Sequence, residues 1–126
     1  HMELSTKSLT SDILKIDFFP SDGDSDPLSE GIEFDIENQG KFVELIETVL
    51  DQKSPHILLN MENITYIDSS GLWALFEGHR KTQRIGRSFF LCNVSKDVKR
   101  VLVITQLASK FVIVNNEAEA ISSLES

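Results

Sequence analysis

The stretch Ile64-Thr65-Tyr66-Ile67-Asp68-Ser69-Ser70-Gly71-Leu72 joins two kinds of local structure. Its first four residues favour a strand, and apolar residues recur at helical spacing after Gly71. We therefore expect a strand to end near Asp68 and a helix to begin at Ser69 or Ser70. The first N–H groups of a helix lack backbone partners and stabilise anionic groups. This point of the chain is suited to a phosphate, whether bound from outside or attached to a serine.

The rest of the chain alternates between strand and helix patterns. Period-two alternation or short apolar runs predict strands at residues 13–19, 32–36, 56–59, 89–94 and 111–114. Apolar residues at helical spacing predict helices at residues 41–52, at 69–84, from 95 onwards, and at 117–124. Residues 64–67 are either a partner of the strand at 56–59 or a connecting segment. Strands that alternate with helices imply helices packed on a sheet, so the sequence predicts a single α/β domain.

The composition is that of one compact domain. With 126 residues and 40% apolar content, the chain can form a hydrophobic core. We set residues 1–2 aside as a remnant of tag removal and treat 3–126 as the domain. No segment approaches the roughly 20 apolar residues that cross a bilayer, and we expect neither a secretory signal nor membrane insertion. The lone Cys92 favours core packing in a reducing cytoplasm over a disulfide framework.

The charges are unevenly distributed. A net charge of −8 disfavours nucleic acid as a partner, because binding to phosphates needs clustered Lys and Arg. Every ionisable residue from 17 to 37 is acidic, whereas basic residues cluster between 80 and 100. The two regions are either solvated faces or a two-sided surface that orients a protein partner.

The acidic loop Pro20–Pro27 imitates part of a calcium site. Carboxylates at residues 22, 24, 26, 30 and 33 match ligand positions of an EF-hand loop. Pro27 replaces the glycine that such a loop needs for its sharp turn, and predicted strands rather than helices flank the loop. We therefore interpret it as a solvated acidic loop.

The sequence lacks the constellations of a catalytic site. A catalytic serine needs a histidine base. His79 lies about two and a half turns along the helix from Ser69, and His56 begins a strand, so neither is placed to activate that hydroxyl. The chain has no glycine-rich phosphate loop, no Cys/His metal spacing and no G-x-S-x-G elbow. We predict a protein that is not an enzyme and that needs no cofactor or metal.

Two side chains at the predicted helix start have alternative interpretations. The predicted apolar face of this helix comprises Leu72, Leu75, Phe76 and His79. Trp73 is rotated by about 100° from Leu72, so it either packs at the edge of the core against residues 41–52 or anchors a protein interface. Ser69 is either a plain helix N-cap or the acceptor of a phosphate.

The order of these features resembles a known family. Residues 64–72, the helix after them, Gly86, the strand at 89–94 and Val98-Lys99-Arg100-Val101-Leu102 are similar to the bacterial anti-sigma factor antagonists, which are single STAS domains. The resemblance extends from His56 to about Leu124. It implies a mixed four- to five-stranded sheet with about four helices packed mainly on one face.

The resemblance also implies a cytoplasmic switch in transcription regulation. Family members bind an anti-sigma factor that is itself a serine protein kinase, which frees a sigma factor. The kinase then phosphorylates the serine after the aspartate and ends binding, and a PP2C-type phosphatase restores it. The alternative is a STAS subunit of another assembly, such as a lipid-transport complex or a stress-signalling scaffold, without sigma-factor regulation. We expect a monomer or weak dimer.

The family pattern, carried onto this chain, and the residues at the predicted helix start together give eight candidate site residues. The phosphorylated residue is Ser69, with Ser70 as the runner-up. The residues that support the phosphorylation site are Asp68, Asp35 and Gly71, of which Asp68 would position the hydroxyl or the kinase's magnesium. The partner-binding residues are Trp73, Leu72 and Arg80.

Overall fold

The computed structural model describes residues 2–20 and 31–125. Most of the acidic loop, with the candidate calcium ligands at 22, 24, 26 and 30, lies outside the described residues. In chain order the elements are β1 (Met2–Ser8), β2 (Ile13–Pro20), β3 (Ile32–Phe34), α1 (Gln39–Gln52), β4 (His56–Asn60), β5 (Ile64–Ile67), α2 (Ser69–Arg84), β6 (Phe89–Cys92), α3 (Lys96–Ile104), the short 3-10 turn η1 (Ala108–Lys110), β7 (Val112–Val114) and α4 (Glu117–Glu125).

The main sheet is mixed and has the strand order β1-β2-β4-β6-β7. β1 runs antiparallel to β2, and the other neighbours are parallel. β3 and β5 form a separate parallel pair in which Phe34 lies opposite Ile67. Residues 64–67 therefore pair with β3, and not with β4 as one of the two sequence interpretations had it. The connection after β4 leaves the main sheet, and the Asn63 carbonyl accepts a hydrogen bond from the Ile32 N–H (2.8 Å).

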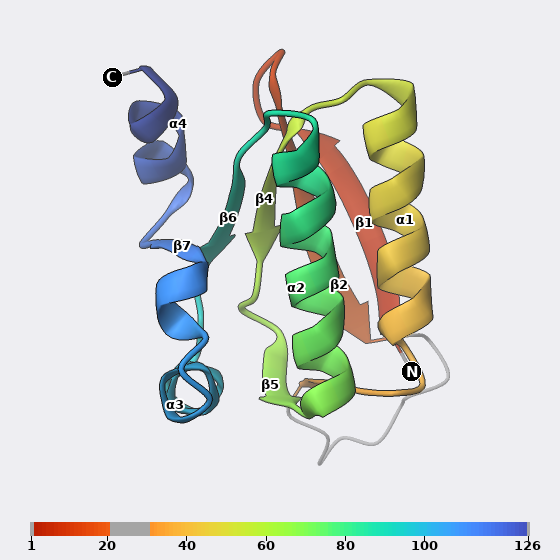
Figure 1. The fold of residues 1–126 in the computed structure, drawn as a ribbon, viewed down its shortest axis with the longest axis vertical. Coiled ribbons are helices and arrows are strands. Elements are labelled where there is room, and N and C mark those ends of the chain that lie inside the picture. Colours follow the sequence, from red (N-terminus) through yellow and green to blue (C-terminus); the bar gives the residue numbers. More distant parts are fainter. Residues whose placement is uncertain (1, 21–30, 126) are drawn as a thin grey trace.

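Alternating side chains of β4 separate the two faces of the sheet. Ile57 and Leu59 join the large core under α1, α2 and α3, whereas Leu58 belongs to a smaller core under α4. Figure 1 shows α1 and α2 side by side across one face of the sheet. The predicted α/β architecture, with helices mainly on one face, is therefore confirmed. No helix within residues 2–20 and 31–125 combines the length and apolar character that a bilayer crossing requires.

One strand was not predicted, and two predicted strands are shorter than expected. β1 was not predicted, because only Met2 and Leu4 of this edge strand face the core. Met2, which we set aside on sequence grounds, is 3% exposed and lies opposite Pro20. β6 ends at Cys92, since Asn93 adopts a left-handed backbone (φ 56°). β3 ends at Phe34, whose carbonyl oxygen accepts a hydrogen bond from Asp68 N–H (3.2 Å).

Candidate functional site

Asp68 holds the first turn of α2. Its backbone is extended (φ −102°, ψ −174°), and its Oδ1 accepts hydrogen bonds from the N–H groups of Ser70 (2.9 Å) and Gly71 (3.0 Å). A carboxylate satisfies these N–H groups and also interacts favourably with the positive end of the helix. The interpretation of Ser69 as the N-cap is therefore wrong. Ser69 is the first helical residue, and its side chain is exposed.

Gly71 lets the end of β3 approach the start of α2. A Cβ atom at this position would lie 2.2 Å from the Phe34 carbonyl oxygen and 2.7 Å from Ile67 Cγ1. Real Cβ atoms do not come so close to backbone, so any larger residue must displace β3 or α2. The close packing at Gly71 therefore fixes where α2 begins relative to β3.

Asp35 lies at the same edge of the small sheet as Asp68. The two residues follow Phe34 and Ile67, which are paired across the parallel strands. The Asp35 Oδ1 accepts a hydrogen bond from Glu37 N–H (3.0 Å), and the Asp35 N–H donates to Asn38 Oδ1 (2.9 Å). The Asp35 carboxylate thus helps to build the turn into α1 beside the start of α2.

The exposed side chains of α2 match the predicted partner-binding residues only in part. Leu72 is 9% exposed and belongs to the large core, so its assignment to partner binding is corrected to packing. Trp73 is 51% exposed, which excludes a buried position at the core edge and fits the interface alternative. Phe76, predicted on the apolar face, is 38% exposed. With 100° per residue, Ser69, Trp73, Phe76 and Arg80 lie within about 60° of one another around the helix axis and so form a stripe along α2.

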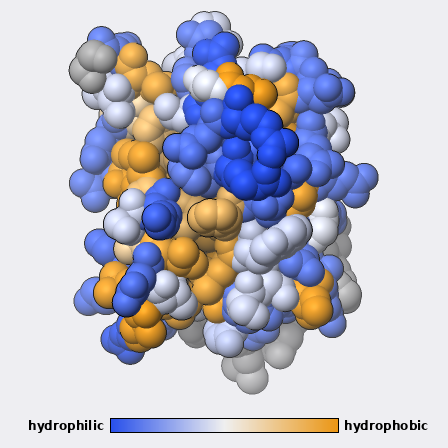
Figure 2. Space-filling view, viewed as in Figure 1, coloured by the Kyte–Doolittle hydropathy of each residue, from blue (hydrophilic) through white to orange (hydrophobic). Residues whose placement is uncertain are grey.

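Arg80 lies at the far end of this stripe and pairs with its own helix. Its Nε and Nη2 donate to the two carboxylate oxygens of Glu77 at 2.9 and 2.8 Å. This bidentate hydrogen bonding lowers the pKa of Glu77 and raises the pKa of Arg80. Figure 2 shows hydrophilic atoms over the C-terminal half of α2 and paler, mixed atoms over its N-terminal half.

Two further exposed apolar side chains lie near the start of α2. Ile36 belongs to the turn after β3, and Tyr66 is the residue before Ile67 in β5. Sequence reasoning did not single them out, because neither carries a motif. The signal that could have found Phe76 is its spacing of seven residues from Ser69, which places both on one helix face.

His79 and Cys92 are held in packing roles, whereas His56 accepts a hydrogen bond from Ser88 N–H at the start of β4. His79 lies edge-on to Phe89 and Phe111, and burial lowers its pKa. Burial, followed by the charge of Arg87, lowers the pKa of His56. Burial raises the pKa of Cys92 to about 11, which keeps the thiol protonated and confirms its assignment to the core. Within the described ranges, no three His, Cys, Asp or Glu side chains are grouped to hold a metal ion.

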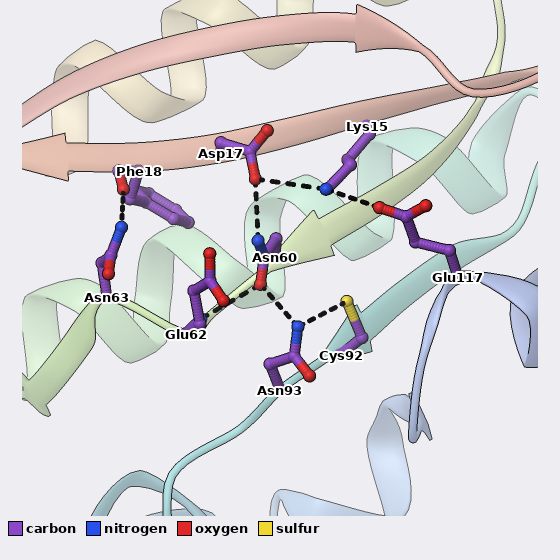
Figure 3. A network of polar contacts seen from close by, with 9 residues as sticks. All are labelled: Lys15, Asp17, Phe18, Asn60, Glu62, Asn63, Cys92, Asn93 and Glu117. Atoms are coloured by element: carbon purple, nitrogen blue, oxygen red, sulfur yellow. Dashed lines mark hydrogen bonds and ion pairs between the residues drawn. The ribbon is translucent and has the colours of Figure 1, made fainter.

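A polar network fixes the connection that leads to the candidate site (Figure 3). Asn60, 4% exposed, donates to Asp17 Oδ1 (2.8 Å), and its Oδ1 accepts from Asn93 Nδ2 (3.0 Å) and Glu62 N–H (3.2 Å). Asn63 donates to the Phe18 carbonyl (2.8 Å). These contacts tie the turn after β4 to β2 and β6, and thereby position β5 and the residues that follow it. No sequence pattern had indicated this network.

Comparisons with known proteins agree with the fold. The STAS domain family model matches residues 31–120. An anti-sigma F factor antagonist from Paenibacillus polymyxa is 28% identical over 83 residues, which are 66% of this chain and 71% of that protein. The structure of the anti-sigma factor antagonist SpoIIAA in its unphosphorylated form matches with a TM-score of 0.73 and 21% identity, over 98% of this chain and 96% of that one. The structure of the Bacillus cell fate determinant SpoIIAA in the phosphorylated form matches with a TM-score of 0.66 and 20% identity, over 97% of this chain and 99% of that one.

Proposed function

This chain belongs to the STAS domain family, and we propose that it is a phosphorylation-switched binding module of the anti-sigma factor antagonist type. Unphosphorylated, it binds an anti-sigma factor that is also a serine protein kinase and so releases a sigma factor. Phosphorylation of Ser69 by that kinase ends binding, and a PP2C-type phosphatase restores it. The proposal includes a cytoplasmic location, no catalytic activity and a monomer or weak dimer.

One observation carries the choice of Ser69. Asp68 caps α2 with two hydrogen bonds, so the Ser69 hydroxyl has no part in holding the helix and is exposed. Ser70 is less accessible, and its N–H is already bonded to Asp68. A kinase can therefore reach Ser69 without unfolding the helix start.

The electrostatics of the helix start favour a switch that leaves the fold intact. A phosphoserine carries about −1.5 to −2 charges at neutral pH. In the first turn the positive end of the helix stabilises a negative charge by about 0.3–1 kcal/mol and so opposes the repulsion from the neighbouring Asp68 carboxylate. A partner surface that fits a neutral hydroxyl would instead have to desolvate the phosphate, at a cost of several kcal/mol.

The exposed side chains around Ser69 suit a protein partner. Trp73 and Phe76 continue the stripe that begins at Ser69, and Tyr66 and Ile36 are exposed next to the start of α2. Exposed aromatic residues are enriched among the side chains that dominate binding energy at interfaces. Arg80, at the end of the stripe, would contribute charge at the rim, where it affects the association rate more than the affinity.

The test compares two acidic substitutions at exposed serines. The binding partner for the test is the kinase that co-purifies with the wild-type protein. Ser69→Asp should reduce the affinity for this kinase by at least about a hundredfold, because a buried charge costs several kcal/mol. Ser122→Asp, on α4, should bind as wild type does. Both variants should melt within about 2 °C of wild type, since surface changes alter stability little. Wild-type affinity in Ser69→Asp would overturn the proposal, and stable association with transporter subunits without any phosphate would favour the alternative assembly.

A further inference from the structure

A small cavity lies at the opposite end of the molecule from Ser69. Its volume is about 220 Å³, and it opens where β2 and β4 begin and where α1 ends. In Figure 1 this is the upper end of the sheet, whereas α2 begins at the lower end. Clefts for drug-sized ligands have volumes of about 300–1,000 Å³. This cavity would therefore hold a small metabolite, but it is too small for a nucleoside triphosphate.

The wall of the cavity is built in advance by the β1–β2 turn. The Thr10 hydroxyl oxygen accepts hydrogen bonds from the N–H groups of Asp12 and Ile13, both at 3.1 Å. The Asp12 carbonyl in turn accepts from His56 N–H at 2.8 Å, which joins the turn to β4. A site whose wall is already ordered loses little entropy when a ligand binds.

Two hydrogen-bond donors face each other beside this cavity without an acceptor between them. His56 Nδ1 accepts from Ser88 N–H (3.0 Å), and a backbone N–H can only donate. The neutral imidazole therefore carries its proton on Nε2, and this nitrogen lies 3.4 Å from Nη1 of Arg87, which is also a donor. One anionic oxygen that accepts from both groups would remove this mismatch.

The remaining lining matches an anion that also carries hydroxyl groups. Lys53 and Arg87 both line the cavity, and no ion pair within residues 2–20 and 31–125 involves either of them. Their charges outweigh the single carboxylate of Asp12. The other polar side chains of the lining are one amide and five hydroxyls, from Gln52, Thr6, Ser8, Thr10, Ser11 and Ser54.

Ser54 directly follows the C-cap of α1 and has the left-handed backbone with which many helices end. Its φ is 48°, and its hydroxyl donates to the Leu50 carbonyl (2.8 Å), which leaves the oxygen lone pairs free to accept. We propose that the cavity is a binding site for a small polyhydroxylated anion of the sugar- or polyol-phosphate class, with the phosphate on Arg87, His56 and Lys53.

The test is a ¹H–¹⁵N NMR titration of the full chain with glycerol phosphate. We expect saturable shifts at the amides of residues 8–13, 53–56 and 87–88, and weaker binding of inorganic phosphate or glycerol alone. Arg87→Gln and Lys53→Gln should each weaken binding about tenfold or more, because each removes a charge-assisted hydrogen bond. Arg84→Gln, an exposed cation at the end of α2, is the control and should bind as wild type does. The dispersion of each spectrum reports whether the variant is folded.

Three results would overturn the proposal. The first is the absence of saturable shifts at tens of millimolar glycerol phosphate, and the second is an unchanged affinity in both folded variants. The third is equal affinity for inorganic phosphate and glycerol phosphate, which would mean an adventitious ion only. The titration involves neither Ser69 nor a protein partner, so its outcome is independent of the proposed switch.

Discussion

Helices α2 and α3 both begin at a serine-containing segment, but they use the serine differently. At α3 the Ser95 hydroxyl is the N-cap and accepts a hydrogen bond from Val98 N–H (3.2 Å). At α2 the carboxylate of Asp68 is the cap, and Ser69 is the next residue. The third helical residue is the buried Val98 in α3 and Gly71 in α2. A serine that caps a helix is needed for the fold, whereas a serine beside a carboxylate cap is free for another use.

The largest effect is expected at Gly71. Gly71→Ala places a methyl group 2.2 Å from the Phe34 carbonyl oxygen, so it should lower the free energy of unfolding by about 3 kcal/mol. Gly40→Ala is the matched control in α1, because no atom lies within 4 Å of the added Cβ. This control should stabilise the protein by up to about 1 kcal/mol. Urea unfolding measures the free energy of unfolding of both variants. Similar changes at the two glycines would show that the contact with the Phe34 carbonyl does not require a glycine at position 71.

Removal of the α2 cap should have the next largest effect. Asp68→Ala leaves the N–H groups of Ser70 and Gly71 without their acceptor, so the free energy of unfolding should fall by about 1–2 kcal/mol. Asp68→Asn retains an acceptor and should recover most of this loss. If Asp68→Ala melts as wild type does, another group holds the start of α2.

Substitution of Ser95, which caps α3, should cost more unfolding free energy than substitution of Ser69, which does not cap α2. Ser95→Ala should cost about 1 kcal/mol of unfolding free energy, because the hydroxyl bond to Val98 N–H is lost. Ser69→Ala should change it by less than about 0.5 kcal/mol, since this exposed side chain does not cap the helix. Denaturation of the two variants side by side tests this, and an equal loss would contradict the assignment of the caps.

Acid should lower the free energy of unfolding through His79, a residue that belongs to neither helix start. Burial lowers the pKa of His79 below its ordinary value of 6.5, so the unfolded chain takes up a proton first. This contribution to stability is complete above pH 6.5 and is lost as the pH falls through the folded-state pKa. His79→Leu should lose less stability than wild type between pH 7 and pH 5, as measured by urea unfolding. An identical slope in the variant would show that His79 does not carry the effect.

The sequence was sufficient to predict the elements around the site, because hydrophobic period is a local property. It predicted a strand that ends near Asp68 and a helix that begins at Ser69 or Ser70, which agrees with the end of β5 at Ile67 and the start of α2 at Ser69. It did not predict the cap, since Asp68 and Ser69 are both favourable N-cap residues and only the extended backbone of Asp68 decides between them.

Features that depend on distant neighbours could not be read from the sequence. Leu72 and Phe76 both fit an apolar helix face, and their burial depends on what packs against α2. The pairing of β5 with β3, and the Asn60 network that positions it, join segments far apart in the chain. Such contacts leave no periodic signal in the sequence.

We propose that the carboxylate cap leaves Ser69 free to accept a phosphate. Mass spectrometry of the protein recovered from its own cells tests this most directly, with wild type and Ser69→Ala expressed in parallel. We expect one phosphate on wild type, mapped to Ser69, and none on the variant. A phosphate mapped to Ser70, or one retained by Ser69→Ala, would contradict it.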